Sequence, residues 1–324
     1  MLTSSGSLID INSDLSNKDF TFDISLGISL RDRIRDLADA FIRRPFYKLA
    51  YGKKYKFLPY KVDLTLPEKG MSVLQRRKWI NQHYPIKNSR VLVIGCGTAN
   101  DLALLLRFKP REIVGIDLLN YSKYWRAIKE YIARENSIIK LNFYQADAAD
   151  LNKLELGKFD IIISDAVFEH CRDLKKVLKS CYNLLQPNGV MYASYGQFWY
   201  CWGGDHFSGR DDIEHGYNHL LLNSFEYEEY FNKHVRDLNY ELSEGGGGGL
   251  FVPLDLFSKL SHKEYIELFA SVGFHAKSLI LEFSANAVKA LKSKELREKL
   301  LKKFPNFTIH DFILKTHIVI LEKI

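Results

Sequence analysis

Two glycines and one carboxylate are spaced as they would be in a site for a nucleotide cofactor. An apolar run over 90–94 is followed by Gly95-Cys96-Gly97 and then by a helical pattern. A buried strand that ends this way delivers unpaired backbone N–H groups to a ligand, and glycine allows its close approach. A second apolar run ends in Asp117. It follows the glycines by about 20 residues, where a carboxylate would hold a ribose diol.

Asn100 stands where a dinucleotide site needs its third glycine. That glycine lets the helix pack tightly beneath a pyrophosphate, so the departure argues against NAD. The segment 90–101 instead resembles motif I of the class I S-adenosylmethionine-dependent methyltransferases. In that family the loop meets an amino-acid moiety, and its final position is tolerant.

The resemblance continues in the family's order from these glycines to the C-terminus. The segment 144–148 resembles the motif whose acid bonds the adenine amino group, and 159–170 resembles the loop after the fourth strand. In 184–190, Asn188 replaces a turn glycine, a mild change because Asn tolerates the left-handed region. The resemblance implies S-adenosyl-L-methionine as cofactor, bound by Gly95, Gly97, Asp117, Leu118, Asp147, Ala148 and Asp165.

Hydrophobic periodicity predicts the same α/β fold without the family. Strand-like runs occur at 90–95, 112–117, 140–145, 159–164 and 189–195, and amphipathic stretches near 100–107, 121–134 and 172–185. Their alternation predicts a parallel sheet whose ligands lie beyond the strand ends. After an insertion, the pattern predicts a helix over 263–273, a strand over 274–283, a helix over 285–303 and a strand over 313–321. The resemblance to the methyltransferase family implies the rest of the architecture: a doubly wound, Rossmann-like sheet of seven strands with an antiparallel last hairpin.

The 324 residues exceed a minimal core of this fold, and 46% of them are hydrophobic. We therefore expect a mobile tail over 1–20, an N-terminal helical extension over 21–84 and a methyltransferase domain over 85–324 with an insertion at 196–262. The tail lacks the basic start and apolar centre of a signal peptide. The four cysteines lack the Cys-x-x-Cys spacing of a zinc site. This favours reduced thiols and a cytoplasmic protein.

The candidate catalytic residues are His206, His170 and Asp205. Methyl transfer to a hydroxyl needs an in-line geometry and a group that takes the proton. His170 closes the loop after the fourth strand, where it could equally serve only as a packed helix-start residue. Asp205 and His206 come after the fifth strand in the sequence. Three aromatic residues precede them, on whose rings a planar acceptor could lie: Trp199, Tyr200 and Trp202. These rings could also simply pack the insertion.

Acidic residues and histidines near 205–219 also raise the question of Mg²⁺, but their spacing does not resemble a metal site, and we predict none. The five glycines at 245–249 predict a flexible loop, either a lid or a plain linker.

The segment 31–56 carries nine Lys or Arg residues against three Asp residues, and 9 − 3 gives most of the chain's net charge of +7. Interleaved aromatic residues allow three interpretations: a helix on an anionic membrane, a patch for a phosphorylated acceptor, or a solvated helix packed on the fold. We predict that it caps the site, with Tyr47 and Tyr51 pointing toward the acceptor. No nucleic-acid-binding motif is present.

These features together predict S-adenosylmethionine-dependent methyl transfer to a small molecule or saccharide. The expected acceptor is a hydroxyl of a cell-surface glycan or its precursor. One alternative is N-methylation of a small amine or a nucleic-acid base, although 164–167 lacks the Asn/Asp-Pro-Pro-Tyr motif of enzymes that methylate nucleic-acid amino groups. The other is a scaffold that binds the cofactor without catalysis, against which Asp117 and Asp147 argue. The sequence does not predict the oligomeric state.

Overall fold

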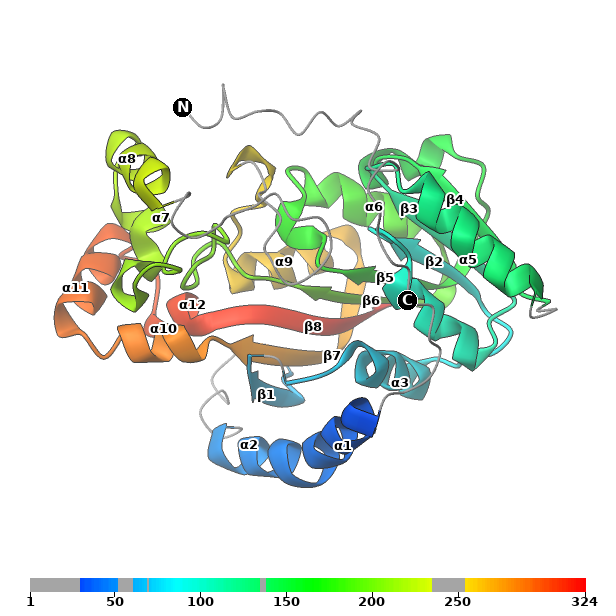
Figure 1. The fold of residues 1–324 in the computed structure, drawn as a ribbon, viewed down its shortest axis with the longest axis horizontal. Helices are drawn as coiled ribbons and strands as arrows, with labels where there is room; N and C mark the ends of the chain where they lie inside the picture. Colours follow the sequence, from blue (N-terminus) through cyan, green and yellow to red (C-terminus); the bar gives the residue numbers. More distant parts are fainter. Residues whose placement is uncertain (1–29, 52–60, 69, 135–137, 235–253) are drawn as a thin grey trace.

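The computed structural model describes residues 30–51, 61–68, 70–134, 138–234 and 254–324, which build a single mixed sheet (Figure 1). Its strands are β1 (Leu64–Pro67), β2 (Arg90–Ile94), β3 (Glu112–Asp117), β4 (Lys140–Gln145), β5 (Phe159–Asp165), β6 (Leu185–Tyr195), β7 (Phe274–Phe283) and β8 (Leu314–Lys323). They lie in the order β1-β7-β8-β6-β5-β2-β3-β4. Only β8 runs antiparallel to its described neighbours, β6 and β7. The predicted doubly wound sheet with an antiparallel last hairpin is confirmed.

The prediction of seven strands was wrong by one, because the N-terminal extension is not wholly helical. Its residues Leu64–Pro67 form β1, which pairs in parallel with β7. Backbone hydrogen bonds from Asp63 N to Leu279 O and from Glu68 N to Phe283 O, 2.8 and 2.9 Å long, extend this pairing at both ends. An unpaired edge strand exposes a row of backbone donors and acceptors, and β1 covers that row on β7. A run of four residues ending in proline gave no recognisable strand signal.

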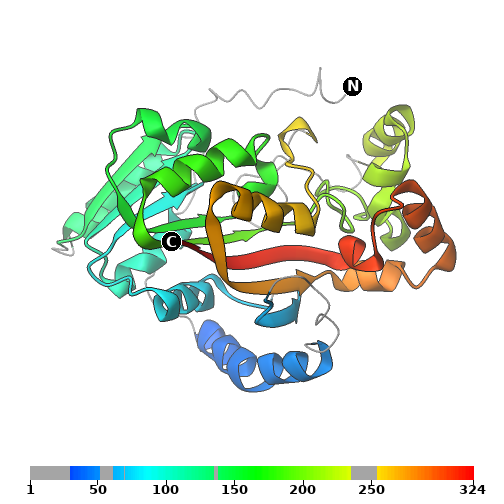
Figure 2. The same ribbon diagram turned by 180° about the vertical axis from the view of Figure 1, so that it is seen from behind.

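Helices cover both faces of the sheet, and each face holds its own hydrophobic core (Figures 1 and 2). One face packs α6 (Leu174–Leu184) and α9 (His262–Val272), and the other packs α3 (Val73–His83) and α5 (Ser122–Arg134). In β5, Phe159 and Ile162 belong to the first core, while Ile161 and Ile163 belong to the second. Burial on both sides explains why this strand reads as a continuous apolar run.

Several helix boundaries differ from the prediction. The helix expected over 285–303 is two helices, α10 (Ala285–Ala290) and α11 (Lys294–Lys303). Ser293 separates them because its side chain accepts a hydrogen bond from Leu296 N and so starts a new helix. The helix expected near 100–107 is a short α4 (Asn100–Ala103) continued by a 3₁₀ turn, η3 (Leu104–Phe108), and α12 (Ile309–Ile313) precedes β8.

Between β6 and α9, the described part of the insertion contains η6 (Ile213–Tyr217), α7 (Asn218–Leu221), α8 (Ser224–His234) and η7 (Leu254–Leu256). It lies beside the end of β6, next to α10 and α11 (Figure 1). Trp202 occupies its interior: a Cβ added to Gly216 would come within 1.9 Å of the indole. The glycines at 245–249 lie outside the described residues.

The described part of the N-terminal extension begins with a helical arm, which we define as α1 (Leu30–Ala38), the π-helical turn η2 (Asp39–Arg43) and α2 (Arg44–Tyr51). The arm lies alongside β1, at the bottom of Figure 1. It therefore flanks the edge of the sheet that β1 forms.

Candidate active site

The loop after β2 has the backbone conformation that its glycines predict. Gly95 and Gly97 have φ values of +69° and +47°, in the left-handed region. A Cβ added to Gly95 would lie 2.1 Å from Val167 Cγ2, whereas one added to Gly97 would meet nothing within 4 Å. Gly95 thus lets the loop after β5 pack on the loop after β2. Gly97 faces open space, which its missing side chain leaves to a ligand.

The carboxylate of Asp117 is bonded directly to this glycine loop. Its Oδ2 accepts a hydrogen bond from Gly97 N at 2.7 Å, and its Oδ1 accepts one from Leu119 N at 2.9 Å. Trp125 of α5 donates its indole N–H to Gly97 O at 2.8 Å, which fixes the loop from the other side. Burial raises the pKa of Asp117, and the backbone donors oppose that shift. Because a carboxylate has about four acceptor positions, lone pairs remain for the hydroxyls of a ribose.

The other predicted cofactor residues follow at the neighbouring strand ends. Leu118 is 46% exposed directly after β3. Asp147 is exposed after β4, and it accepts a hydrogen bond from Ala149 N at 2.8 Å, which places Ala148 in the turn that it caps. The open space at Gly97 and the acceptors at Asp117 and Asp147 fit the ribose and base of S-adenosylmethionine. Their contacts with it remain a prediction.

Asp165, also predicted to bind cofactor, takes part in a buried ion-pair cluster. Its Oδ2 lies 2.5 Å from Arg77 Nη2, and its Oδ1 lies 3.4 Å from Arg76 Nη1 and accepts a hydrogen bond from Tyr192 at 2.9 Å. Burial alone would raise the pKa of Asp165, but the two guanidinium groups hold it below its ordinary value. Arg76 also donates to Ser194 Oγ at 2.7 Å. Both arginines lie on α3, so the cluster attaches the N-terminal extension to the ends of β5 and β6.

The structure brings together two predicted catalytic residues that are distant in sequence. The rings of His170 and His206 meet edge to face, with centroids 5.0 Å apart and planes at 87°. Phe257 packs against both, with centroid distances of 5.0 Å to His170 and 5.2 Å to His206. The Nδ1 atom of His170 is buried without a hydrogen-bond partner among the described residues. Phe257 is not among the predicted site residues, because its isolated position in the chain carries no functional signal.

Both histidines are neutral at physiological pH. Burial, and to a lesser degree the neighbouring His206, lowers the pKa of His170 to about 3. Burial likewise lowers the pKa of His206 to about 4, although the nearby Asp205 opposes the shift. Each neutral imidazole keeps one nitrogen lone pair that can accept a hydrogen bond.

The loop that carries His206 is held in a strained conformation. His206 has φ of +66°, a region that residues other than glycine seldom adopt. Its carbonyl oxygen accepts a hydrogen bond from Arg210 Nε at 2.8 Å, and its N–H donates to Gly203 O at 2.9 Å. Strain of this kind persists only where the surroundings impose it, and it concentrates at functional sites.

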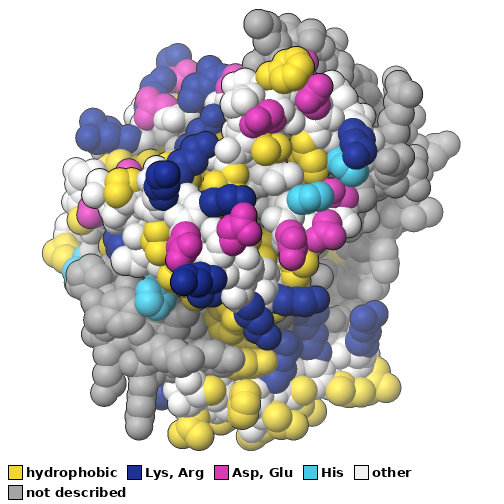
Figure 3. Space-filling view, turned by 90° about the vertical axis from the view of Figure 1, so that its left-hand side faces the viewer, with side chains coloured by type: hydrophobic (Ala, Val, Ile, Leu, Met, Phe, Trp, Pro, Cys, Tyr) yellow, Lys and Arg dark blue, Asp and Glu magenta, His cyan; other side chains and the backbone are white. Residues whose placement is uncertain are grey.

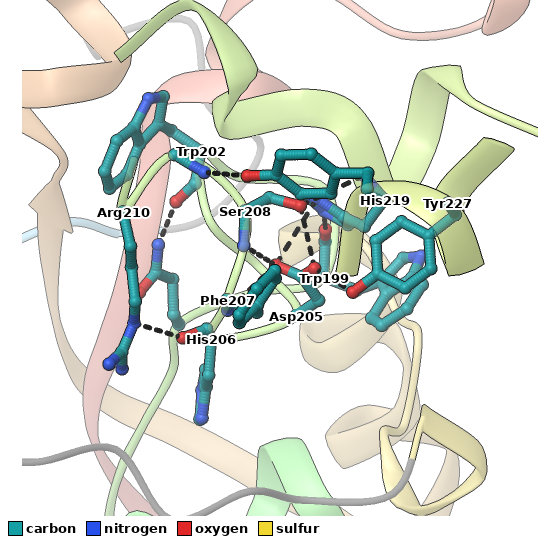
Figure 4. A network of polar contacts seen from close by, with 12 residues as sticks. Trp199, Trp202, Asp205, His206, Phe207, Ser208, Arg210, His219 and Tyr227 are labelled. Carbon is teal, nitrogen blue, oxygen red and sulfur yellow. Dashed lines mark hydrogen bonds and ion pairs between the residues drawn. The ribbon is translucent and has the colours of Figure 1, made fainter. Parts of the chain in front are cut away.

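Asp205 holds this loop through buried hydrogen bonds within the insertion. Its buried carboxylate accepts hydrogen bonds from Ser208 N and Ser208 Oγ, both at 2.8 Å, and from the Tyr227 hydroxyl at 2.5 Å. Burial alone would raise its pKa, but His219 and these donors lower it. Figure 4 shows the carboxylate turned toward Ser208, His219 and Tyr227, while the His206 ring points away from them. These contacts suit Asp205 to holding the loop in place.

Glu169 is a buried carboxyl group beside His170 that is not among the predicted site residues. Its Oε1 accepts a hydrogen bond from Gly196 N at 3.1 Å, and its Oε2 has no partner within the described part of the chain. Burial raises the pKa of Glu169 to about 8, so it is mostly protonated at neutral pH. The Glu-His pair at the end of 159–170 was the available signal.

The three rings proposed to hold an acceptor have separate surroundings. Tyr200 packs against Phe304 and Phe307, and the Trp202 indole donates to Ile213 O at 2.8 Å inside the insertion. Trp199 packs against Phe257, which contacts both histidines, and the Trp199 and Phe257 ring centroids are 5.3 Å apart.

The two tyrosines of the arm were predicted to point toward the acceptor. Tyr47 is half-buried and packs against the core on the α3 face of the sheet, and the side chain of Tyr51 lies outside the described residues. Among the side chains that are described, no three His, Cys, Asp or Glu residues are grouped so that they could hold a metal ion. Within the same ranges, no helix combines the length and apolar character needed to cross a membrane.

Part of this chain is similar in sequence to known methyltransferases. Residues 92–193 match the family described as Methyltransferase domain. The ubiquinone biosynthesis O-methyltransferase of Paraburkholderia phymatum is 29% identical over 119 residues, 37% of this chain and 49% of that protein. The same enzyme of Albidiferax ferrireducens is 30% identical over 122 residues, 37% of this chain and 46% of that protein. The match therefore spans about half the length of these relatives.

Solved structures also show similarity to this chain. One is the geranyl diphosphate C-methyltransferase from Streptomyces coelicolor A3(2), at 11% identity and a TM-score of 0.43, with 77% of this chain and 75% of that chain covered.

Proposed function

Because residues 92–193 form an S-adenosylmethionine-dependent methyltransferase domain, we propose that this chain transfers a methyl group to a hydroxyl oxygen of a small molecule. The observation that carries the proposal is the pair of neutral imidazoles, His170 and His206, after β5 and β6. These strands end at the same edge of the sheet as β2 and β3, which carry the glycine loop and Asp117.

The neutral state of the pair suits the proton that such a transfer releases. S-adenosylmethionine supplies a methyl group on a positively charged sulfur. As the hydroxyl oxygen bonds the methyl carbon, the carbon–sulfur bond would break and its electron pair would stay on sulfur, so the oxygen would become cationic and its proton strongly acidic. An imidazole of lowered pKa can accept that proton at this point, although it is a weak base toward a free hydroxyl. We assign the hydrogen bond from the acceptor hydroxyl to His170 Nδ1, which is buried and unpaired in the described structure.

An oxygen acceptor has more support than the alternatives. The curated relatives are named for O-methyl transfer in ubiquinone biosynthesis, and an acceptor beside His170, His206 and Phe257 would meet mainly ring surfaces. A saccharide has less support, because Tyr200 and Trp202 pack against other parts of the chain. The proposal therefore favours a flat, partly apolar molecule with a hydroxyl group.

The test measures transfer of a labelled methyl group from S-adenosylmethionine to matched panels of phenols, sugar alcohols and amines. We expect turnover on a phenol panel. Turnover confined to amines would contradict the proposal. Calorimetric titration with S-adenosylhomocysteine provides the cofactor control, with Asp117→Ala as the variant that should bind about tenfold or more weakly. That figure reflects the loss of hydrogen bonds to a charged group.

A further inference from the structure

The helical arm exposes an apolar stripe that the rest of the described chain leaves uncovered. Its members are large side chains between 58% and 83% exposed: Leu30, Ile34, Leu37, Phe41, Ile42, Phe46 and Leu49. A surface helix ordinarily turns its apolar stripe toward the core and its charges toward water. Here Tyr47 contacts the core, and the larger stripe points outward. Figure 3 shows hydrophobic side chains gathered along the lower rim of the molecule, with Lys and Arg side chains just above them.

The π-helical turn keeps this stripe continuous. Leu30, Ile34, Leu37 and Phe41 follow the i, i+4, i+7, i+11 spacing of one helix face. The stripe resumes one residue later as Ile42, Phe46 and Leu49. A π-turn holds one residue more than an α-turn, and η2 (Asp39–Arg43) lies where the pattern shifts. The sequence pattern and the backbone therefore shift by the same residue, as expected if the stripe meets a single surface.

Basic side chains accompany the stripe. Over 30–51 there are six Lys or Arg residues against three Asp residues. Arg31, Arg33, Arg35 and Lys48 are exposed, and Arg43 and Arg44 are half-buried. Long basic side chains can lay their methylene stems along an apolar surface while their charges reach outward to anions.

We propose that the arm binds the surface of an anionic lipid bilayer and lies flat in its interface. The 22 residues of α1, η2 and α2 extend for roughly 30 Å. An outward stripe of Leu, Ile and Phe flanked by Arg and Lys is the composition of helices that lie in the headgroup region. Phosphate groups of the lipids complement the positive excess of the arm.

Charge also favours a bilayer over a second copy of the chain. If two arms packed stripe to stripe, each would bring its excess of three positive charges to the same contact. That contact would be opposed by repulsion, whereas an anionic membrane attracts both the stripe and its rim.

The experiment is co-sedimentation of the full chain with vesicles of phosphatidylcholine and phosphatidylglycerol in equal amounts, compared with phosphatidylcholine alone. We expect the chain to sediment with the anionic vesicles and to be released by high salt, which screens surface charges. Phe41→Ser should weaken this binding about tenfold, the loss expected for one buried aromatic side chain. Arg31→Ser combined with Arg33→Ser should weaken it and reduce its salt dependence.

Phe225→Ser is the matched control, because Phe225 on α8 is 68% exposed and lies outside the arm. It should bind vesicles as the unmodified chain does, and circular dichroism verifies that each variant is folded. Failure of the unmodified chain to bind anionic vesicles would overturn the proposal, as would equal losses in Phe41→Ser and Phe225→Ser. Dimerisation in analytical ultracentrifugation that Phe41→Ser abolishes, with vesicle binding unchanged, would assign the stripe to a second copy.

Discussion

The imidazole rings of His170 and His206 meet edge to face, 5.0 Å apart, although they come from the segments that follow two different strands. His170 ends the turn after β5, and His206 lies in the loop after β6. Since β5 and β6 are parallel neighbours, their following segments emerge at one edge of the sheet. Phe257, from just before α9, packs on both rings and makes the pair a small cluster.

Replacing either histidine by alanine should reduce turnover without loss of cofactor affinity. We take His170 as the proton acceptor and His206 as the residue that positions the His170 ring. His170→Ala should then lower kcat roughly 10²-fold or more, which is the usual effect of a lost proton acceptor. His206→Ala should have a smaller effect, and the double variant should be no worse than His170→Ala. Single-turnover kinetics measure the chemical step. Unchanged rates in both variants, with binding of S-adenosylhomocysteine intact, would show that the rings only pack the site.

Glu169 should make the protein less stable as pH rises through the neutral range. The pKa of its carboxyl is raised to about 8 in the folded chain from an ordinary value of 4.5. Between these values the folded state binds more protons than the unfolded state, so the free energy of unfolding falls with rising pH. Glu169→Gln keeps the shape and removes the titration. Urea denaturation across this range should show a shallower fall with pH for the variant, and identical slopes would contradict the assignment.

The buried histidines have the opposite effect on the pH dependence of stability: they make the protein less stable as pH falls. Their pKa values lie below the ordinary 6.5, near 4 for His206. Stability is therefore lost as pH falls from about 6.5 toward 4, because the unfolded state takes up the proton first. His206→Phe should retain more of its stability at acid pH than the unmodified chain. Thermal denaturation at successive pH values measures this difference.

Replacing Gly95 by alanine should mainly impair fold stability, whereas replacing Gly97 should mainly impair cofactor binding. Gly95→Ala should destabilise the fold strongly, because its Cβ would lie 2.1 Å from Val167 Cγ2. Adding Val167→Ala should restore part of the stability. Gly97→Ala meets no atom within 4 Å and should cost only the left-handed strain of about 1–2 kcal/mol, yet weaken S-adenosylhomocysteine binding. Chemical denaturation and calorimetry separate the two effects, and normal binding by Gly97→Ala would place the cofactor elsewhere.

Arg77→Met should destabilise the fold because it leaves Asp165 buried with reduced pairing. Loss of one partner from a buried ion pair typically costs about 3 kcal/mol or more, and Arg77 is fully buried. Adding Asp165→Asn should recover part of this loss. The matched control is Lys299→Met in the exposed pair with Glu295, for which we expect no measurable change in chemical denaturation. Equal behaviour of the two variants would mean that the buried cluster contributes little to stability.

The sequence by itself predicted the features that depend on short-range spacing. Gly95, Gly97, Asp117 and Asp147 follow strands recognisable from their apolar runs, and parallel strands must end at one edge. The strand order from β2 to β8 follows from the same local signals, and Asn188 in β6 has the positive φ, +60°, that its residue type tolerates. The antiparallel last hairpin was implied by the family resemblance. Such features need only a hydrophobic period and a backbone preference.

The tertiary structure alone decided which distant residues meet and which faces turn outward. Arg77 and Asp165, or His170 and Phe257, have no shared period that could pair them in the sequence, because their contact depends on how α3 and the insertion dock. The strand β1 is too short to be recognised from its sequence pattern. It forms because β7 offers an unpaired edge. Helical periodicity places Leu30, Ile34 and Phe41 on one face, but only the docking of the arm through Tyr47 decides that this face meets the exterior.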